Sequence, residues 1–332
     1  MEADQLQPRV GIVVIGRNEG ERLRTCLKSL PAGIPIVYAD SGSQDGSPER
    51  AKELGVDVIE LDVSRPFSAA RGRDEGFARL MERTPSLEYV QFLDGDCELA
   101  RGWLVAAIEY LDSEAVVAVV CGRRREEAPE ASLFNRLMDL EWDAPCGTVD
   151  ACGGDAVVRA SKLKEVGGYN AALIAGEEPE MCLRIRQLGA KIVRLDLPMS
   201  IHDSQIQRFG QWWRRQVRAG HAFAEVAVLH WRVRFRWHEV ASVVVWGGGV
   251  PAAILLMMAR GFEGAPLIAL SYSIPWIRSI RSQRGHGRDA QSAILYATSC
   301  VVGKFAQLLG VLRFVWNGVL YRRPTSLIEY KA

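Results

Sequence analysis

The sequence has a formal net charge of only +1, and it lacks regularly spaced cysteines and an apolar N-terminal segment. Its 332 residues include 41 Lys and Arg and 40 Asp and Glu, so no excess of basic residues suggests a nucleic acid as partner. The seven cysteines show no C-x-x-C spacing, and the pair Cys146 and Cys152 fits no common zinc pattern, so we expect reduced thiols. The polar N-terminus, with Glu2 and Asp4, is not a secretory signal, and the N-terminal half is expected to remain in the cytoplasm.

The first half of the chain alternates short apolar runs with segments of helical spacing. Buried strands are predicted at residues 10–15, 34–39, 56–61 and 89–93. Helices are predicted from Leu23 to Leu30, from a cap at Ser47 with Pro48 first and Gly55 just past the end, and over residues 69–81. This alternation predicts an α/β fold with a parallel sheet covered by helices on both faces.

Polar loops follow three of these strands. They contain Arg17, Asn18 and Glu19 after the first strand, Asp40, Ser41 and Gly42 after the second, and Asp94, Gly95 and Asp96 after the fourth. Ligands of such sheets bind beyond the carboxyl ends of the strands. Two carboxylates on a tight turn suit Mg²⁺ or Mn²⁺, which prefer oxygen ligands. The alternative for these aspartates is an Asx turn that caps the residues after them.

Charge-free runs distinguish the second half. Residues 240–259 are twenty residues without a charge, which is about the length that spans a bilayer core, so we predict a transmembrane helix there. Residues 264–277 are shorter but would complete a hairpin and return the arginine-rich loop after them to the cytoplasmic side. Residues 290–321 are interrupted by Lys304 and Arg313 and are followed by Arg322 and Arg323. A third crossing would place that last pair outside, which favours an interfacial or re-entrant helix. The alternative, that all these runs are core helices of a soluble protein, is disfavoured by the unbroken first run.

From residue 10 to about residue 197 the chain resembles the family 2 glycosyltransferases, whose catalytic domain has the GT-A fold. The motifs that carry the resemblance are residues 15–19 (IGRNE), 40–46 (DSGSQDG), 73–76 (RDEG), 93–96 (LDGD) and 176–180 (GEEPE). The resemblance assigns Asp40 to the nucleoside base, Arg73 to the phosphates and the LDGD motif to the metal. Gly72, directly before the third motif, and Asp74 within it stand where the family usually has Ala and Asn.

The same resemblance implies the remaining site residues. Glu178 is expected to be the general base, with Glu177 as the alternative, although acidic residues at a helix start are also favoured by the helix dipole alone. His202 is expected to complete the metal site. The predicted nucleotide-sugar site consists of Arg17, Asn18, Glu19, Asp40, Ser41, Gly42, Arg73, Asp94, Gly95, Arg214 and Arg215; the acceptor site of Gly154, Asp155 and Glu177; and the metal site of Asp94, Asp96 and His202. The arginine pair lies beside Trp212 and Trp213, and this segment could equally face lipid headgroups.

We therefore predict an inverting transferase that moves a sugar from a UDP-, GDP- or dTDP-linked donor to a lipid-linked, polyprenyl-type acceptor at the inner membrane, with the catalytic domain facing the cytoplasm. Such a reaction serves the assembly of a cell-surface polysaccharide or glycoconjugate. The alternatives are polyprenyl phosphate as the acceptor and a catalytically inactive membrane scaffold. A nucleotidyltransferase is disfavoured because the first loop has no glycine-rich, lysine-bearing phosphate motif.

The predicted organisation has four parts. They are a GT-A catalytic domain at residues 1–203, interfacial amphipathic helices at 204–238, transmembrane and re-entrant helices at 239–321 and a tail at 322–332. The sugar and the acceptor are expected to depend on loops such as residues 122–145.

Overall fold

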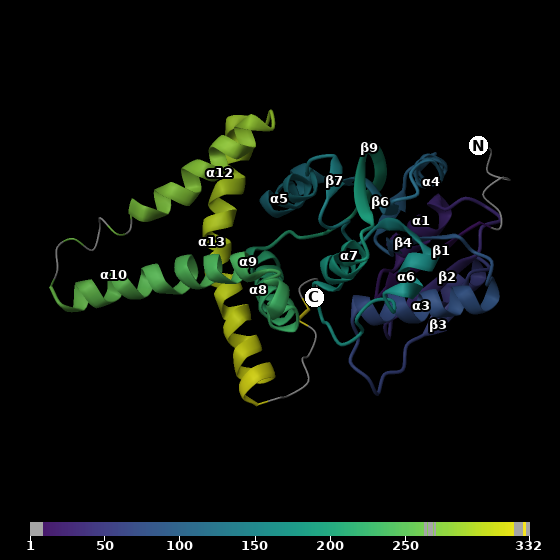
Figure 1. Cartoon of the computed structure of the whole chain (residues 1–332), viewed down its shortest axis with the longest axis horizontal. Helices are drawn as coiled ribbons and strands as arrows, with labels where there is room; N and C mark the ends of the chain where they lie inside the picture. The colour runs from purple at the N-terminus through teal and green to yellow at the C-terminus, as the bar shows by residue number, and fades with distance from the viewer. Residues whose placement is uncertain (1–8, 262–263, 265–267, 269, 322–327, 330–332) are drawn as a thin grey trace. The chain divides into compact units, whose positions relative to one another are not determined.

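The computed structural model describes residues 9–261, 264, 268, 270–321 and 328–329. They form two compact units (Figure 1). The first contains Met1–Ala128 and Glu141–Ser204, and the second contains Pro129–Leu140 and Gln205–Ala332. Each unit is described by itself.

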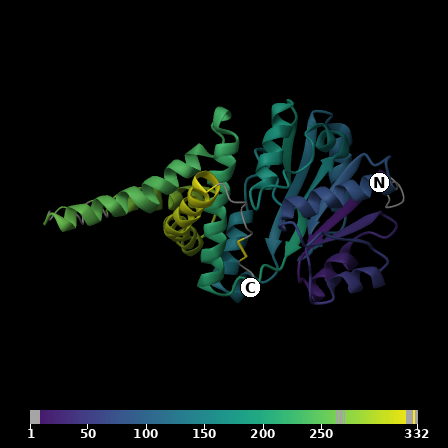
Figure 2. The ribbon, with the colours of Figure 1, turned by 90° about the horizontal axis from the view of Figure 1, so that it is seen from below.

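One half of the sheet in the first unit is parallel. It contains β1 (Val10–Gly16), β2 (Ile36–Asp40), β3 (Asp57–Glu60) and β4 (Tyr89–Asp94). The first three strands lie side by side, purple in Figure 2. Val10, Ile12, Val13 and Val14 of β1 are fully buried, as expected of a strand covered on both faces. The helices between these strands are α1 (Glu21–Ser29), α2 (Ser47–Glu53) and α3 (Ala69–Arg83).

The start of α2 differs from the prediction. Gly46, with a φ of 81°, is the cap, and Ser47 is the first helical residue. The Ser47 hydroxyl is buried and accepts a hydrogen bond from the backbone N–H of Gly20 at 3.2 Å. Ser47 therefore joins the loop after β1 to α2 instead of capping the helix.

The other half of the sheet is mixed. It contains β5 (Cys97–Leu99), β6 (Val117–Glu126), β7 (Gly147–Val149), β8 (Ala156–Arg159) and β9 (Lys191–His202), with helices α4 (Trp103–Ser113), α6 (Ala160–Glu165) and α7 (Glu177–Gln187). The strand order is β3-β2-β1-β4-β8-β6-β9-β5, and β7 pairs with β9. Because β8 is antiparallel to β4, the loop before β8 reaches the edge where β4 ends. The predicted α/β fold, with a parallel first half of the sheet, is confirmed.

Part of the segment predicted as a loop, residues 122–145, is regular structure. Strand β6 continues to Glu126, η2 covers Pro129–Ala131, and α5 covers Leu133–Trp142. Arg123 of β6 forms ion pairs with Asp143 at 2.8 Å and Asp196 at 2.5 Å. These ion pairs neutralise Arg123, whose charge makes the end of the strand resemble a loop in the sequence.

The second unit is helical. Its elements after α5 are α8 (Phe209–Leu229), η3 (Trp231–Val233), α9 (Trp237–Val243), the π-helix η4 (Val244–Gly249), α10 (Val250–Ala259), η5 (Leu270–Tyr272), α12 (Ser273–Gly285), α13 (Ala290–Phe314) and the π-helix η6 (Val315–Leu320). Helix α8 packs closely on α13: a Cβ on Gly220 would lie 1.9 Å from the carbonyl oxygen of Gln307. The Gln307 side chain donates to Gln216 at 2.8 Å across the same contact.

Among the described residues of this unit, two helices are long and apolar enough to cross a membrane. They are Trp237–Ala259, with a mean hydropathy of 2.0, and Ala290–Leu320, with 1.5. The first contains the predicted span. The second is a helix of 31 residues that covers most of residues 290–321, and the interfacial, re-entrant and crossing alternatives for it remain predictions. Parts of the predicted hairpin arm, residues 265–267 and 269, and all of the predicted tail except residues 328 and 329 lie outside the described residues.

Candidate functional site

The LDGD motif forms a fixed turn at the carboxyl end of β4. Asp94 is the last residue of the strand, and the N–H of Gly95 donates to the carbonyl oxygen of Ile15 at 2.7 Å. A Cβ on Gly95 would lie 3.1 Å from that oxygen, so glycine permits the close approach to β1. The turn thereby holds Asp94 and Asp96 at the predicted edge of the sheet.

Asp96 lies beside His202, the last residue of β9. The two residues face each other because β5 pairs with β9 in the register Cys97 to His202. The Oδ2 atom of Asp96 lies 3.3 Å from Nε2 of His202, and Nδ1 of His202 lies 3.4 Å from Oε2 of Glu126. All three side chains are buried. The predicted pair of metal ligands is therefore brought together, with a second carboxylate behind the imidazole.

The donor set of Asp96 and His202 fits a divalent cation. Burial, together with the charge of Arg124, lowers the pKa of His202, which favours the neutral ring. A neutral imidazole has one N–H, so one of its two carboxylate contacts brings two lone pairs together. A proton on Nδ1, donated to Glu126, leaves Nε2 and Asp96 as adjacent ligands. Ligands about 2.1 Å from a metal in neighbouring octahedral positions lie about 3 Å apart, which is close to the 3.3 Å found here.

Asp94 has a different environment. Its Oδ1 accepts a hydrogen bond from Arg73 at 2.7 Å, and its Oδ2 accepts one from Arg124 at 3.1 Å. Both carboxylate oxygens thus face guanidinium groups, which compete with a metal for the same oxygens. Asp96, not Asp94, is the aspartate whose neighbours suit a cation.

Arg73 joins the LDGD turn to the start of α7. Its side chain is buried and also donates to Oε1 of Glu177 at 2.5 Å. Burial alone would lower the pKa of Arg73, but the charges of Asp94 and Glu177 outweigh it and raise the pKa. Arg73 therefore remains a cation at this edge.

Asp155 and Gly154, predicted to contact the acceptor, support Asp94. One carboxylate oxygen of Asp155 accepts from the backbone N–H of Asp94 at 3.1 Å, and the other accepts from the Ser200 hydroxyl at 2.6 Å. A Cβ on Gly154 would lie 2.8 Å from Oδ2 of Asp94 and 3.0 Å from Nη2 of Arg73. Only glycine leaves the ion pair undisturbed, and a role in acceptor binding stays a prediction.

Glu178 is held at the start of α7 by two neighbours. Its Oε1 accepts from the N–H of Cys152 at 2.5 Å and from the thiol of Cys182, one helical turn further along, at 3.2 Å. Within the part of the chain that the structure describes, Oε2 accepts no hydrogen bond. One oxygen is therefore fixed and the other is left to accept a proton, as a general base requires.

Asp40 forms the Asx-type turn that was the alternative to base binding. Its carboxylate accepts from Tyr38 at 2.8 Å, from the Ser43 hydroxyl at 2.5 Å and from the N–H groups of Gly42 and Ser43 at 2.9 and 2.8 Å. These bonds use the four acceptor positions of a carboxylate. Burial and the neighbouring Asp40 raise the pKa of Tyr38 far above its ordinary range, so the phenol remains a donor. A nucleoside base would have to displace one of these donors.

The other residues of the two loops also hold loop structure. Asn18, with a φ of 56°, donates through its N–H to Ser43 and accepts from the N–H of Gln44, both at 2.8 Å. The Ser41 N–H donates to the carbonyl of Gly16 at 3.0 Å. Gly42, with a φ of 78°, faces the Phe67 ring, and the Arg17 guanidinium lies 5.3 Å from the centre of that ring. Glu19 pairs with Arg22 at 2.7 Å.

Arg214 and Arg215 lie on α8 in the second unit. Their predicted contact with a diphosphate stays a prediction, as does the alternative that this helix faces lipid.

The sequence did not predict Arg124, Glu126 or Trp142 as site residues. The Trp142 ring meets the His202 ring edge-on with centres 4.4 Å apart, and the Arg124 guanidinium lies 4.7 Å from its centre. The spacing of two residues between Arg124 and Glu126 places them on one face of β6. This two-residue spacing is the sequence feature from which Arg124 and Glu126 could have been placed together.

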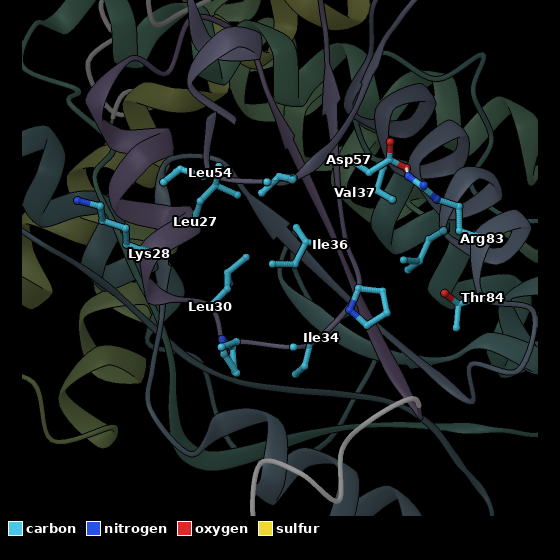
Figure 3. A pocket seen from close by; sticks show the side chains of 17 residues that line it. Leu27, Lys28, Leu30, Ile34, Ile36, Val37, Leu54, Asp57, Arg83 and Thr84 are labelled. Carbon is cyan, nitrogen blue, oxygen red and sulfur yellow. Dashed lines mark ion pairs between the residues drawn. The ribbon is translucent and has the colours of Figure 1, made fainter. Parts of the chain in front are cut away.

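A separate hollow of about 600 Å³ lies at the amino ends of β2 and β3 (Figure 3). Its lining mixes apolar residues, such as Leu27, Leu30 and Ile34, with the charged residues Lys28 and Arg83. Its one lining carboxylate, Asp57, forms an ion pair with Arg83 at 2.8 Å. This hollow contains none of the predicted site residues.

Residues 11–166 match the model of glycosyl transferase family 2. The chain is 27% identical over 267 residues to the pre-mycofactocin glycosyltransferase of Mycobacterium tuberculosis, covering 76% of this chain and 53% of that protein. The chain thus spans about half the length of that relative. Glycosyltransferase AglE of Haloferax volcanii is 21% identical over 255 residues, covering 72% of this chain and 80% of AglE.

Two solved structures share the fold. The mannosyltransferase PcManGT from Pyrobaculum calidifontis, solved with GDP-Man and Mn²⁺, superposes with a TM-score of 0.64 at 16% identity, covering 93% of this chain and 87% of its own. S. aureus TarS superposes with a TM-score of 0.52 at 13% identity, covering 92% and 91%. At these identities the likeness concerns the fold alone.

Proposed function

We propose that this chain, whose residues 11–166 match glycosyl transferase family 2 and which has the GT-A fold, is an inverting, metal-dependent transferase. It moves a sugar from a nucleotide sugar to an acceptor held at a membrane. The observation that carries the proposal is the set of three buried side chains at one sheet edge, Asp96, His202 and Glu126, beside the Arg73 and Glu178 region. This edge of the sheet combines two cation ligands, the fixed positive charge of Arg73 and the Glu178 carboxylate with one oxygen available.

In this proposal Asp96 and His202 hold Mg²⁺ or Mn²⁺, and Glu126 orients the imidazole. A bound ion supplies neutralisation of the diphosphate leaving group. The presence of Mn²⁺ in the structure of PcManGT, which shares the fold, supports this assignment. Asp94 contributes as the partner of Arg73 and Arg124, and its direct contact with the ion is secondary because both of its oxygens face those arginines.

The donor binds at the loops after β1 and β2, together with Arg73. The hydrogen bonds of Asp40 and Asn18 preset these loops, so little conformational freedom is lost when a nucleoside binds against them. Arg73, which is buried, and Arg124, which is half-buried, supply two guanidinium groups, which suit a diphosphate. The complex of PcManGT with GDP-Man supports the binding of a nucleotide sugar on this fold.

Glu178 serves as the general base. The Oε1 contacts with Cys152 and Cys182 fix the carboxylate, and Oε2 takes the proton from the acceptor hydroxyl as that oxygen attacks the anomeric carbon. Attack on the face opposite the leaving diphosphate inverts the anomeric configuration.

The acceptor is lipid-linked and reaches the site at the cytoplasmic face of the inner membrane. Two features support this placement: the two helices long and apolar enough to cross a bilayer, and the tryptophan- and arginine-rich segment of α8 and η3. A polyprenyl-linked glycan combines a lipid, which suits a chain with membrane helices, with a hydroxyl from which the general base can take a proton.

Ligand-dependent stability tests the proposal. In the detergent-purified chain, at least one nucleotide diphosphate or nucleotide sugar should raise the thermal midpoint only when Mn²⁺ or Mg²⁺ is present. At a ligand concentration of 100 times Kd the gain is about 2.7 kcal/mol. Asp96→Asn should lose the metal-dependent part, whereas Glu82→Gln, an exposed carboxylate on α3, should retain it. No metal-dependent stabilisation by any nucleotide would refute the proposal.

The role of Glu178 distinguishes a hydroxyl acceptor from polyprenyl phosphate. A phosphate oxygen is already ionised and needs no base. Glu178→Gln should therefore lower kcat by a factor of about 10² to 10⁴ while leaving donor binding intact, and Glu178→Asp should recover part of the rate. A variant Glu178→Gln with undiminished kcat would favour the phosphate acceptor.

A further inference from the structure

Two buried cysteines lie beside the base candidate. The Sγ atoms of Cys152 and Cys182 are 3.6 Å apart, and Oε1 of Glu178 is 3.2 Å from Sγ of Cys182. The three donor atoms all lie within 4.8 Å of one another, and all three residues are buried. Cys152 precedes β8, while Glu178 and Cys182 occupy one face of α7. Two separate segments thus contribute to one cluster.

The spacing of the cluster suits a soft metal. With metal–sulfur distances of about 2.3 Å, two thiolates at neighbouring corners of a tetrahedron lie about 3.7 Å apart. The observed 3.6 Å needs little rearrangement. Thiolate ligands select Zn²⁺ and similar cations, whereas Mg²⁺ and Mn²⁺ prefer oxygen. The cluster therefore differs in kind from the site of Asp96 and His202.

We propose that Cys152, Cys182 and Glu178 form a second metal site, which binds a thiophilic divalent cation such as Zn²⁺ or Cd²⁺. Binding converts two thiols to thiolates: each S–H bond breaks, each sulfur forms a bond to the cation, and two protons leave to the solvent. The Glu178 carboxylate supplies a third ligand, and a water molecule supplies the fourth. No oxidant is required.

The site has a consequence for catalysis that rests on the proposed function of Glu178. A cation at this cluster holds Glu178 through Oε1, withdraws charge from the carboxylate and weakens it as a proton acceptor. It also ties the segment before β8 to the first two turns of α7. Sugar transfer then requires a hard cation at Asp96 and is inhibited by a soft cation at the two cysteines.

A competing cluster involves Cys97. Its Sγ lies 3.7 Å from Oδ1 of Asp96 but also accepts a hydrogen bond from Arg124 at 3.0 Å. A guanidinium beside the sulfur opposes a metal cation, and this cluster has a single thiol. The number of thiolates per bound metal therefore separates the two clusters.

Burial favours the thiol form until a metal arrives. Burial raises the pKa of Cys182 to about 11, and the contact with Cys182, together with burial, raises the pKa of Cys152. Such thiols react slowly with oxidants, because the thiolate is the reactive form. Metal affinity should consequently increase as pH rises, since the two protons compete with the cation.

Cadmium titration tests the site without reference to activity. The full chain in detergent carries Cys146→Ser and Cys300→Ser, because these two cysteines are exposed. Addition of Cd²⁺ should produce the ultraviolet charge-transfer band of cadmium thiolate, with two thiolates and two protons released per Cd²⁺. Cys152→Ser and Cys182→Ser should each lower the affinity by at least about tenfold and remove one thiolate. Cys97→Ser is the matched control and should leave the titration unchanged.

The outcomes separate this site from the others. Cys152→Ala and Cys182→Ala repeat the test with apolar replacements, and their thermal midpoints show whether each variant folds. A band that is absent, or that disappears with Cys97→Ser and not with the other two variants, overturns the proposal. If Cd²⁺ binds as expected but leaves Mn²⁺-dependent transfer unaffected, the metal site stands and the inhibitory role assigned through Glu178 is wrong.

Discussion

At the residue scale, Asp94 and Asp96 have different neighbours although one glycine separates them. Asp94 lies between Arg73 and Arg124, while Asp96 faces His202. The LDGD motif predicts two carboxylates on one turn, but the sequence does not show which arginines reach them. Arg124 comes from a strand 30 residues further along, so only the folded register distinguishes the two aspartates.

Glu126 should strengthen metal binding without contacting the metal. Glu126→Gln removes the charge that holds the Nδ1 proton of His202, so the affinity for Mn²⁺ should fall by a factor of about 10 to 100. Isothermal titration with Mn²⁺ in the presence of a nucleoside diphosphate measures the change. The affinity of nucleotide alone should be unaltered. Equal Mn²⁺ affinity in the variant and the wild type would remove Glu126 from the site.

Gly154 should be intolerant of a methyl group. Gly154→Ala places a carbon 2.8 Å from Oδ2 of Asp94 and 3.0 Å from Arg73, so the ion pair must separate. We expect KM for the nucleotide sugar to rise or kcat to fall by about tenfold or more, because a displacement of about 1 Å in a positioning group has effects of this size.

The neighbouring glycine provides the control for that substitution. Gly153 has a φ of 87° and nothing within 4 Å of its ideal Cβ position. Asparagine adopts left-handed conformations readily, so Gly153→Asn should leave the steady-state constants close to those of the wild type. Equal kinetics for Gly154→Ala and the wild type would show that the close contact has no functional importance.

At the scale of elements, the alternation of apolar runs predicted β1 to β4 and the helices between them. Strand β6 could not be found in the same way. Its second half contains three consecutive arginines, and their ion pairs with distant carboxylates, such as Arg123 with Asp196, exist only in the fold. The role of Asp40 could not be predicted for the same reason. From the sequence alone, an aspartate in a turn is as well suited to cap the turn as to bind a ligand.

Helices α8 and α13 should depend on glycine at their crossing. A Cβ on Gly310 would lie 2.0 Å from the carbonyl oxygen of Val217 and 2.6 Å from the backbone nitrogen of His221. Because both atoms are backbone, the helices must separate, and Gly310→Ala should cost about 1 to 3 kcal/mol. The thermal midpoint in detergent measures this loss. Gly285→Ala, with nothing within 4 Å, should leave the midpoint unchanged or slightly higher.

His221, on α8, should make the stability of the helical unit depend on pH. Burial, together with the charge of Arg313, lowers its pKa from 6.5 to about 4 in spite of Glu225 3.5 Å away. Above pH 6.5 the residue is neutral in both states. Between pH 6.5 and about 4 the unfolded chain binds a proton that the folded chain does not, so the free energy of unfolding falls as pH falls.

Comparison with a variant isolates this contribution. When the pH is lowered from 7 to 4.5, the thermal midpoint of the wild type should fall by more than the midpoint of His221→Gln. Other titrating groups are common to both proteins and cancel in the difference. Parallel changes in the two midpoints would mean that His221 does not contribute.

At the scale of the whole molecule, the sequence predicted a GT-A domain followed by helices that include candidate membrane spans. It assigned residues 129–140 to the first part of the chain, whereas they pack within the helical unit. Aromatic contacts of Phe134 with Phe209 and Trp212 explain this grouping. Such contacts join residues about 75 positions apart in sequence, and no local periodicity reveals them.

Metal-dependent turnover of a nucleotide sugar tests the central claim most directly. The detergent-purified chain is incubated with UDP-, GDP- and dTDP-linked sugars, and release of the nucleoside diphosphate is followed. We expect slow hydrolysis of at least one donor, loss of activity with a chelator, recovery with Mn²⁺ or Mg²⁺, and no recovery in Asp96→Asn. Hydrolysis that continues in the presence of chelator, or no hydrolysis of any donor, would contradict the account.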